Sequence, residues 1–198
     1  MAWVAHVSNK SGSMTQSEME QNATEIYNQL RGYGWTLNAI CAVLGNMQYE
    51  SYLNPAQWQI GYDIGSQSAG YGLVQFTPST KYTNWANEQG YDITDGERQV
   101  YAIDAQPWGR EYIPTSSFPL SYSEFKVSDK DLDYLTEAFL RNYERAGVSA
   151  LETRQQYANN WYKFLSGEEP PTPDPPEPTP TKKKKSMPLY FYPCVRYC

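Results

Sequence analysis

The chain has few of the side chains that bind transition metals: one histidine, His6, and three cysteines in 198 residues. No cysteine pair lies near His6, so no set of zinc ligands occurs at a usable spacing. Cys41 falls within an apolar helical pattern and is predicted to be a buried free thiol, while Cys194 and Cys198 lie close to the end of the chain. We therefore expect no disulfide framework, no metal site and no other cofactor.

Long apolar runs and broad basic surfaces are also missing. No stretch of about 18 apolar residues occurs, and the first residues lack a basic region followed by an apolar one. We expect neither a membrane span nor a signal peptide. The net charge is −6, and the only basic cluster is the run from Lys182 to Lys185, so nucleic acid is not an expected partner.

Aromatic side chains, in contrast, are abundant, with 18 Tyr and 6 Trp. They are ample for the core of a single domain, which is what a chain of this length can hold. Tyr and Trp rings also stack on the apolar faces of sugars. For any single ring, a place in the core is the simpler interpretation.

A proline-rich segment at residues 167–181, GEEPPTPDPPEPTPT, is predicted to be an extended, semi-rigid linker. It ends a globular domain over residues 1–166. Residues 182–198 form a basic and then apolar tail that is too short to fold alone. We expect this tail to dock onto its own domain, a second copy or a larger assembly, unless it is an artificial extension.

Apolar residues recur at helical spacing through most of residues 1–166. Four stripes are predicted to face the core: Ala23, Ile26, Tyr27 and Leu30; Ala39, Ile40, Val43, Leu44 and Met47; Leu132, Leu135, Phe139 and Tyr143; and Tyr157, Trp161, Phe164 and Leu165. Thr36 is a suitable N-cap for the second helix. Between Trp58 and Phe76, glycines among Tyr, Ile and Val predict a small β-hairpin, after which a helix begins near Thr77. The predicted fold class is α+β and mostly α.

Glu50 lies in the apolar stripe of the second predicted helix. At about 100° per residue, Glu50 falls about 20° from Val43, within the stripe. Burial disfavours the charged form of a carboxyl group, so Glu50 is predicted to keep its proton near neutrality, as a general acid must. Alternatively, the helix ends before Glu50 and leaves it in solvent near Asn54 and Pro55.

Two ordered motifs resemble the lysozyme superfamily: Gly45-Asn-Met-Gln-Tyr-Glu-Ser-Tyr-Leu-Asn-Pro55, and Gln75 within Gly70-Tyr-Gly-Leu-Val-Gln-Phe-Thr-Pro78. Supporting segments are Ser79-Thr-Lys-Tyr-Thr-Asn-Trp-Ala86 and Phe139-Leu-Arg-Asn-Tyr-Glu-Arg145. The match covers most of residues 17–166 and is closest to lysozyme domains in tail proteins of short-tailed bacteriophages. The resemblance implies a lysozyme-like helical domain in which a helix ends on the general acid, Glu50, and a Gly-Leu-x-Gln segment forms the floor of a sugar cleft.

The second catalytic role is open. Chicken-type lysozymes carry a second carboxylate immediately before the Tyr-Gly-x-x-Gln segment, but Gly70 stands at that position. Asp63 is the only acidic residue between Glu50 and Glu88, which makes it the candidate base or charge partner. An Asp that merely belongs to a glycine-flanked turn is an equally good interpretation of Asp63.

Five further residues are predicted to bind the substrate. Gln75 and Tyr71 have amide and phenol groups that hydrogen-bond sugar hydroxyls and N-acetyl groups. The resemblance suggests that Tyr143 faces the cleft. Trp58 and Tyr62 stack on sugars or else cover the hairpin.

Glu144 is adjacent to Tyr143 in the sequence and needs a separate interpretation. Because Arg141 and Arg145 are near it on the predicted helix, Glu144 is predicted to pair with one of them on a solvated face.

The resemblance implies a phage-borne muramidase that cleaves the MurNAc–GlcNAc bond of bacterial peptidoglycan. It would be attached to the virion tail, with residues 182–198 available to bind other tail proteins, or be released to the host cell wall. A lytic transglycosylase that leaves 1,6-anhydro ends is the nearest rival, since these enzymes and goose-type lysozymes also lack the chicken-type nucleophile. A non-catalytic wall-binding or structural tail-tip module is the alternative from another class, although it has no need of Glu50 in an apolar stripe.

Overall fold

The computed structural model describes residues 3–146 and 150–168. The predicted linker and tail therefore lie outside the described residues, apart from Gly167 and Glu168. Within the described ranges the chain forms these helices: α1 (Gln16–Gly32), α2 (Leu37–Ser51), α3 (Thr80–Glu88), α4 (Gly96–Ala105), α5 (Tyr122–Lys126), α6 (Leu132–Phe139), the π-helical turn η1 (Leu140–Glu144) and α7 (Leu151–Ser166). None of the helices in this part of the chain is long and apolar enough to cross a membrane.

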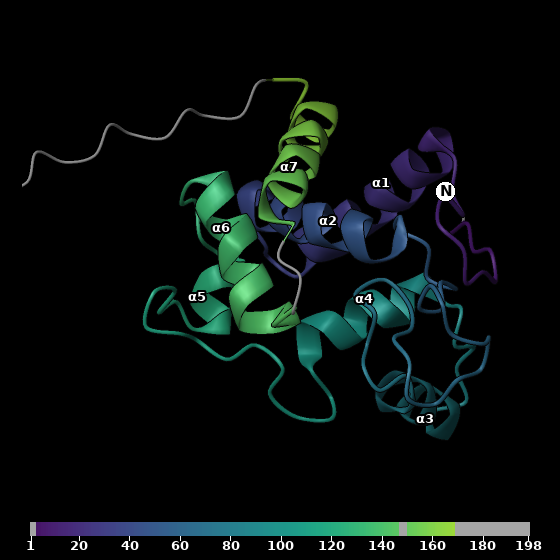
Figure 1. Ribbon diagram of the computed structural model, residues 1–198. Helices are drawn as coiled ribbons and strands as arrows, with labels where there is room; N and C mark the ends of the chain where they lie inside the picture. Colours follow the sequence, from purple (N-terminus) through teal and green to yellow (C-terminus); the bar gives the residue numbers. More distant parts are fainter. Residues whose placement is uncertain (1–2, 147–149, 169–198) are drawn as a thin grey trace, which may run out of the picture.

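The central element is α2, which contacts α1, α5, α6 and α7 (Figure 1). Every residue from Asn38 to Met47 is buried, as expected for a helix that is apolar on nearly all sides. Thr36 caps this helix, since its hydroxyl accepts a hydrogen bond from the Ala39 N–H at 3.2 Å. The predicted N-cap is thus confirmed, and Cys41 is confirmed as a buried free thiol.

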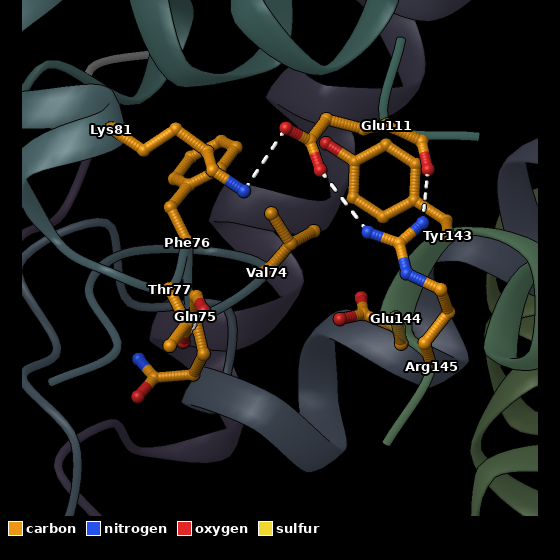
Figure 2. A pocket seen from close by; sticks show the side chains of 9 residues that line it. All are labelled: Val74, Gln75, Phe76, Thr77, Lys81, Glu111, Tyr143, Glu144 and Arg145. Atoms are coloured by element: carbon orange, nitrogen blue, oxygen red, sulfur yellow. Dashed lines mark hydrogen bonds and ion pairs between the residues drawn. The ribbon is translucent and has the colours of Figure 1, made fainter. Parts of the chain in front are cut away.

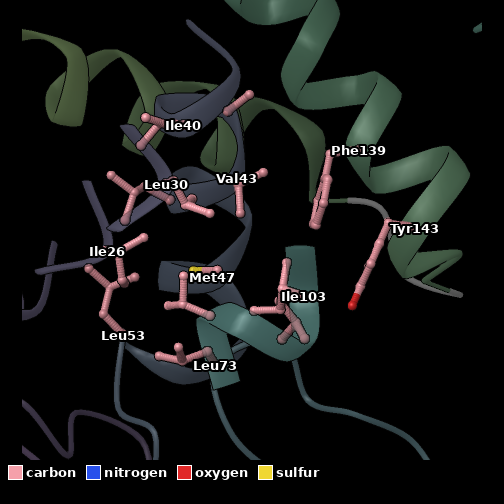
Figure 3. Packing of buried hydrophobic residues seen from close by; sticks show 14 of the residues in the cluster. Ile26, Leu30, Ile40, Val43, Met47, Leu53, Leu73, Ile103, Phe139 and Tyr143 are labelled. Atoms are coloured by element: carbon pink, nitrogen blue, oxygen red, sulfur yellow. The ribbon is translucent and has the colours of Figure 1, made fainter. Parts of the chain in front are cut away.

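The core forms where side chains of α1, α4 and α6 meet those of α2. Figure 3 shows Ile26 and Leu30 of α1, Met47 of α2, Ile103 of α4 and Phe139 of α6 converging in this region. All five are fully buried. These positions bear out the helical stripes predicted for the first, second and third helices.

The fourth predicted stripe, on α7, is only partly right. Trp161 is buried, but Phe164 is 46% exposed. The buried face of α7 consists of Arg154, Ala158 and Trp161. These residues have helical spacing too, but an arginine occupies the first position, so a pattern based on apolar residues alone misses it.

The close crossing of α7 and α2 depends on Gly45. A Cβ at this position would lie 2.5 Å from the Arg154 carbonyl oxygen and 2.8 Å from the Ala158 Cβ. Neither atom can rotate away, so any side chain larger than hydrogen would push the helices apart. Gly45 thereby brings Arg154 next to the C-terminal half of α2.

The β-hairpin predicted between Trp58 and Phe76 is not seen. Only isolated bridges occur there, between Trp58 and Tyr71 and between Tyr71 and Phe76. The backbone closes tight turns instead, such as those in which Tyr62 N–H donates to Gln59 O and Gln75 N–H donates to Gly72 O. The prediction of a mostly helical domain holds, but the β component is reduced to these bridges.

Side chains supplement the few backbone pairs of this segment, such as that from the Gln59 N–H to Gly70 O at 2.9 Å. The Gly70 N–H donates to Gln59 Oε1 at 2.8 Å, and the Leu73 N–H donates to the buried Gln99 Oε1 at 2.8 Å. The Gln99 amide in turn donates to Pro55 O at 2.6 Å. Because the buried backbone groups are satisfied in this way, the segment is stable without a sheet.

Residues 3–15 pack along the domain and are held by two asparagines. Val4 exchanges backbone hydrogen bonds with the Asn22 side chain at 2.9 and 2.8 Å. His6 does the same with Asn54 at 3.1 and 2.7 Å. The ring of Trp3 covers Gly96 so closely that no Cβ would fit there.

Candidate functional site

Two adjoining hollows lie between the end of α2, the 59–77 segment and η1. The larger, of about 420 Å³, is lined by Glu50, Gln59, Ile60, Gln75, Thr77, Glu144 and Ala146. The smaller, of about 90 Å³, is lined by Val74, Gln75, Phe76, Thr77, Lys81, Glu111, Tyr143, Glu144 and Arg145 (Figure 2). Gln75, Thr77 and Glu144 line both hollows, so the two adjoin, and we call them together the Glu50 groove.

Glu50 lies in the last turn of α2, and its side chain is 18% exposed. The helix continues to Ser51, so the alternative in which it ends before Glu50 is wrong. The carboxylate is not isolated among apolar groups, however, because Arg154 donates to Glu50 Oε1 at 2.5 Å. The carboxylate is therefore paired with a buried guanidinium, and the purely apolar surroundings expected from the sequence are not found.

Arg154 is the buried partner that the sequence analysis missed. Its side chain is 1% exposed, donates to Asn46 Oδ1 at 3.0 Å and stacks over the Tyr49 ring at 4.2 Å. These contacts, like that with Glu50, are to residues of α2. Helical spacing could have indicated that Arg154 is buried, since it lies four residues before Ala158 on the buried face of α7.

Glu144 brings a second carboxyl group into the Glu50 groove. Its Oε1 atom is buried and has no hydrogen-bonding partner among the described residues. Loss of hydration raises the pKa of Glu144 well above its usual range, and the charge of Glu50 raises it further, against the opposing effects of Arg154 and Arg145. Glu144 therefore keeps its proton at pH values where an ordinary glutamate has lost it.

The pairing predicted for Glu144 is wrong. Arg141 pairs with Glu137 at 3.1 Å, and Arg145 pairs with Glu111 at 3.4 Å. Both arginines are thus engaged elsewhere, and Glu144 faces the groove.

The local helix geometry explains this difference. The chain leaves α6 through the π-helical turn η1, in which the Arg145 N–H donates to the Leu140 carbonyl five residues earlier at 2.8 Å. A π turn is wider than an α turn, so each residue rotates less about the axis. Glu144 is thereby turned back toward the buried side. An isolated π turn has no sequence signature that would have predicted this.

Glu111 fixes one end of the groove through three donors. Trp108 Nε1 donates to its carboxylate at 2.8 Å, Lys81 Nζ lies at 3.0 Å, and Arg145 lies at 3.4 Å. Figure 2 shows this carboxylate between Lys81 and Arg145, bridging the smaller hollow. The ion pairs connect α3 with the residue that follows η1, so they hold two separate parts of the chain at a fixed distance.

Two of the residues predicted to bind substrate lie at the groove with Glu50. Gln75 lines both hollows, and its amide donates to Gln57 O and Gly72 O, each at 3.1 Å. Tyr143 lines the smaller hollow and stacks on Phe139, with the ring centroids 4.6 Å apart. Tyr143 is 6% exposed, so its ring is part of the wall rather than a projecting group.

The structure does not bring the other predicted residues to the lining of the groove. Tyr71 is buried, and its hydroxyl donates to Ile93 O at 3.1 Å. Trp58 is 7% exposed and packs on Tyr71 with centroids 4.5 Å apart. Tyr62 and Asp63 belong to the 59–77 segment, but they are exposed and are not among the residues that line the groove.

The space around Gly70 is occupied. A Cβ at this position would lie 2.9 Å from Gln75 Oε1 and 3.1 Å from Gln75 Cβ. Gln75 therefore fills the region into which a side chain at position 70 would project.

In the described ranges no group of three or more His, Cys, Asp or Glu side chains is placed to hold a metal ion.

Comparison with known proteins gives the family. The model of a family described as phage tail lysozyme matches residues 21–165. Morphogenesis protein 1 of Bacillus phage B103 is 39% identical over 163 residues, which make up 80% of this chain and 43% of that protein. The chain thus spans less than half the length of this relative. The extent of the family match shows that the chain belongs to the phage tail lysozyme family.

Proposed function

We propose that the protein is a muramidase that cleaves the MurNAc–GlcNAc bond of bacterial peptidoglycan, with Glu50 as the proton donor to the leaving oxygen. The observation that carries this proposal is the position of Glu50, which ends a buried helix and faces a groove that holds a second carboxyl group, in a member of the phage tail lysozyme family. Glycoside cleavage requires an acid and a group that stabilises positive charge on the sugar.

The lining of the groove suits a glycan. Gln59 and Gln75 present amides, and Thr77 presents a hydroxyl, which can bind sugar hydroxyl and N-acetyl groups. Ile60 lines the same space and is 53% exposed, so it offers an apolar surface to a sugar ring. Ile60 was not among the residues predicted from the sequence.

A direct single displacement is the proposed course of the reaction. With Gly70 in place of a carboxylate and Gln75 filling the adjacent space, the double displacement of chicken-type enzymes has no nucleophile at that position. The attacking group is then water, which gives hydrolysis, or a hydroxyl of the sugar itself, which gives a transglycosylase. Asp63 stays a prediction as base or charge partner, on an exposed loop beside the groove.

We further propose that the protein acts as part of the phage tail during wall penetration. The support is the family description and the name of the relative, a morphogenesis protein. Binding of residues 182–198 to other tail proteins belongs to the same proposal. The alternative setting is release of the protein to the host cell wall.

The test is digestion of purified peptidoglycan by the wild type and by Glu50→Gln, with Glu137→Gln as the matched control. Glu137 is a surface glutamate of α6 that pairs with Arg141. Loss of a general acid should lower the rate by about 100-fold or more, and the control should stay within about twofold of the wild type. Equal rates for wild type and Glu50→Gln would contradict the role of Glu50.

Mass spectrometry of the products separates the remaining functions. Reducing ends are expected from a muramidase, whereas 1,6-anhydro ends would identify a transglycosylase. A wild-type protein that binds peptidoglycan without releasing fragments would instead be a non-catalytic wall-binding or tail-tip module.

A further inference from the structure

We infer that Glu50 and Glu144 share one proton beside Arg154, and that Glu144 is a positioning residue that determines when Glu50 carries this proton. The inference rests on the proposed function, in which Glu50 is the acid. It assigns a role to Glu144 that the sequence analysis did not foresee.

The geometry places the three groups together. Glu50 and Glu144 line the same hollow, and Arg154 contacts Glu50 at 2.5 Å. Arg154 is fixed by Asn46 and Tyr49, so its charge stays at this end of α2. Oε1 of Glu144 has no hydrogen-bonding partner among the described residues, so a proton can leave or join this oxygen without breaking a hydrogen bond.

Charge balance favours one proton for the pair. With both carboxyl groups ionised, Arg154 would neutralise only one of two negative charges in a poorly hydrated region, which is costly. With one proton, the group of Glu50, Glu144 and Arg154 is neutral. Two carboxyl groups coupled in this way titrate as a pair. We assign the resting proton to Glu144, whose Oε1 is buried without a hydrogen-bonding partner among the described residues.

The surroundings of Glu144 support this assignment. The charged or titratable groups that act on it are Glu50 on α2, Arg154 on α7, Arg145 and Tyr143 at η1, and Glu111 in the preceding loop. Of these, Arg145 is already paired with Glu111. Arg154 is paired with Glu50, so the charged groups outside the Arg145–Glu111 pair that respond when the proton moves are Glu50 and Arg154.

In the reaction, the proton leaves a carboxyl oxygen of Glu144 and joins a carboxylate oxygen of Glu50. Negative charge passes from Glu50 to Glu144, and Arg154 keeps its positive charge. Glu50 then donates the proton to the glycosidic oxygen as the bond to the anomeric carbon breaks. At that point both carboxylates are ionised and face the positively charged sugar, and the proton released by the attacking hydroxyl or water restores the pair.

The test compares pH–rate profiles of peptidoglycan digestion for wild type, Glu144→Gln, Glu144→Asp and the control Glu137→Gln. Glu144→Gln leaves a single carboxyl group facing Arg154, which should lose its proton at lower pH because the ionised form is then neutralised. The alkaline limb should move to lower pH by about one unit or more, which is about a tenfold loss of rate at neutral pH. Near pH 5 the loss should be below about threefold, and Glu144→Asp should restore part of the alkaline limb.

A merely structural role would give a different result. If Glu144→Gln scaled the rate equally at every pH, or left the profile unchanged, the inference would be wrong. Glu137→Gln should reproduce the wild-type profile, because this glutamate is outside the groove.

Carbon-13 NMR titration of the glutamate carboxyl groups gives a readout that does not depend on activity. One resonance should titrate well above the others in the wild type and should be absent in Glu144→Gln. In Glu50→Gln it should titrate at lower pH than in the wild type, since the neighbouring negative charge is gone. If Glu50→Gln abolishes digestion but no such resonance exists, the proposed function stands and this inference fails. If the coupled titration is present but Glu50→Gln digests normally, the role of Glu50 as acid fails instead.

Discussion

The two walls of the Glu50 groove are built in different ways. One wall consists of helices, with Glu50 on α2 held against Arg154 on α7 through the close crossing at Gly45. The other wall, which carries Gln59 and Gln75, consists of turns whose backbone groups bond to side chains. The first wall depends on packing and on the buried contact between Arg154 and Glu50, and the second on individual hydrogen bonds.

This difference indicates a division of roles. Proton transfer requires a fixed geometry, and close-packed helices supply it. The recognition of a polymer of hydroxyl and amide groups requires many polar groups, and turns that are braced by glutamine side chains supply those. Substitutions in the helical wall should therefore affect both stability and the rate of the chemical step, whereas substitutions in the turn wall should act mainly on substrate binding.

The largest effect is expected for Arg154→Met, which removes the charge that binds the helical wall together. The change leaves the Glu50 carboxylate and the buried Asn46 Oδ1 without their donor. Removing one partner of a buried ion pair costs about 3–5 kcal/mol, so urea unfolding should show a loss of this size. Arg141→Met, at a surface pair, should cost less than about 1 kcal/mol. Equal losses for the two variants would show that the buried pair contributes no more to the free energy of unfolding than the surface pair.

Gly45→Ala tests the same wall through packing alone. The added methyl group would meet the Arg154 carbonyl oxygen and Ala158, so α7 must shift. We expect a loss of about 1–3 kcal/mol in the free energy of unfolding, together with a lower kcat because Arg154 moves relative to Glu50. Gly32→Ala is the control, since a Cβ there meets nothing within 4 Å. An unchanged free energy of unfolding in Gly45→Ala would mean that the crossing of α2 and α7 has room for a methyl group.

Gln99→Leu tests the turn wall. It removes the acceptor for the Leu73 N–H and the donor to Pro55 O and Ile93 O. An unpaired buried group costs about 1–3 kcal/mol, but the leucine side chain recovers part of this by apolar burial, so we expect a smaller loss than for Gly45→Ala. The Michaelis constant should rise more than kcat falls.

The control for this change is Gln89→Leu, at an exposed position after α3. It should leave both kinetic constants and the unfolding transition unchanged. A fall in kcat without a change in the Michaelis constant in Gln99→Leu would contradict the division between the two walls.

The smallest effect is expected for Glu18→Gln, where α1 meets the N-terminal segment. Bonds from Thr15 and His6 lower the pKa of Glu18 from 4.5 to about 2. Because the folded-state value is lower, this contribution to stability is complete above about pH 4.5 and disappears as the pH falls toward 2. The difference in melting temperature between wild type and Glu18→Gln should therefore shrink over this range. A difference that stays constant with pH would rule out the charged cap as its source.

Features set by helical periodicity could be predicted from the sequence. The stripes around Ile26, Val43 and Phe139, the cap at Thr36 and the position of Glu50 at the end of a buried helix all follow from spacing and residue type. The surroundings of these side chains could not be predicted, because the partner of Glu50 comes from α7, 104 residues later in the sequence. Periodicity shows that a side chain points inward, but it does not show what the side chain meets.

The features that could not be predicted depend on local backbone geometry or on distant hydrogen bonds. The π turn that rotates Glu144 into the groove has no compositional signal. The turns around Gly70 are stable because Gln59 and Gln99 happen to reach them, so glycine and aromatic content alone suggested a hairpin. Tyr71 and Trp58, which were expected at the sugar, are part of the core of this segment.

The N-terminal segment has a practical consequence for the choice of fragments. The family match begins at residue 21, yet the Trp3 ring covers Gly96. The backbones of Val4 and His6 bond to the side chains of Asn22 and Asn54. A truncated protein that started at residue 21 would expose two buried amides and open the contact at the start of α4. The smallest unit suited to expression and crystallisation is therefore longer at its N-terminal end than the family boundary suggests.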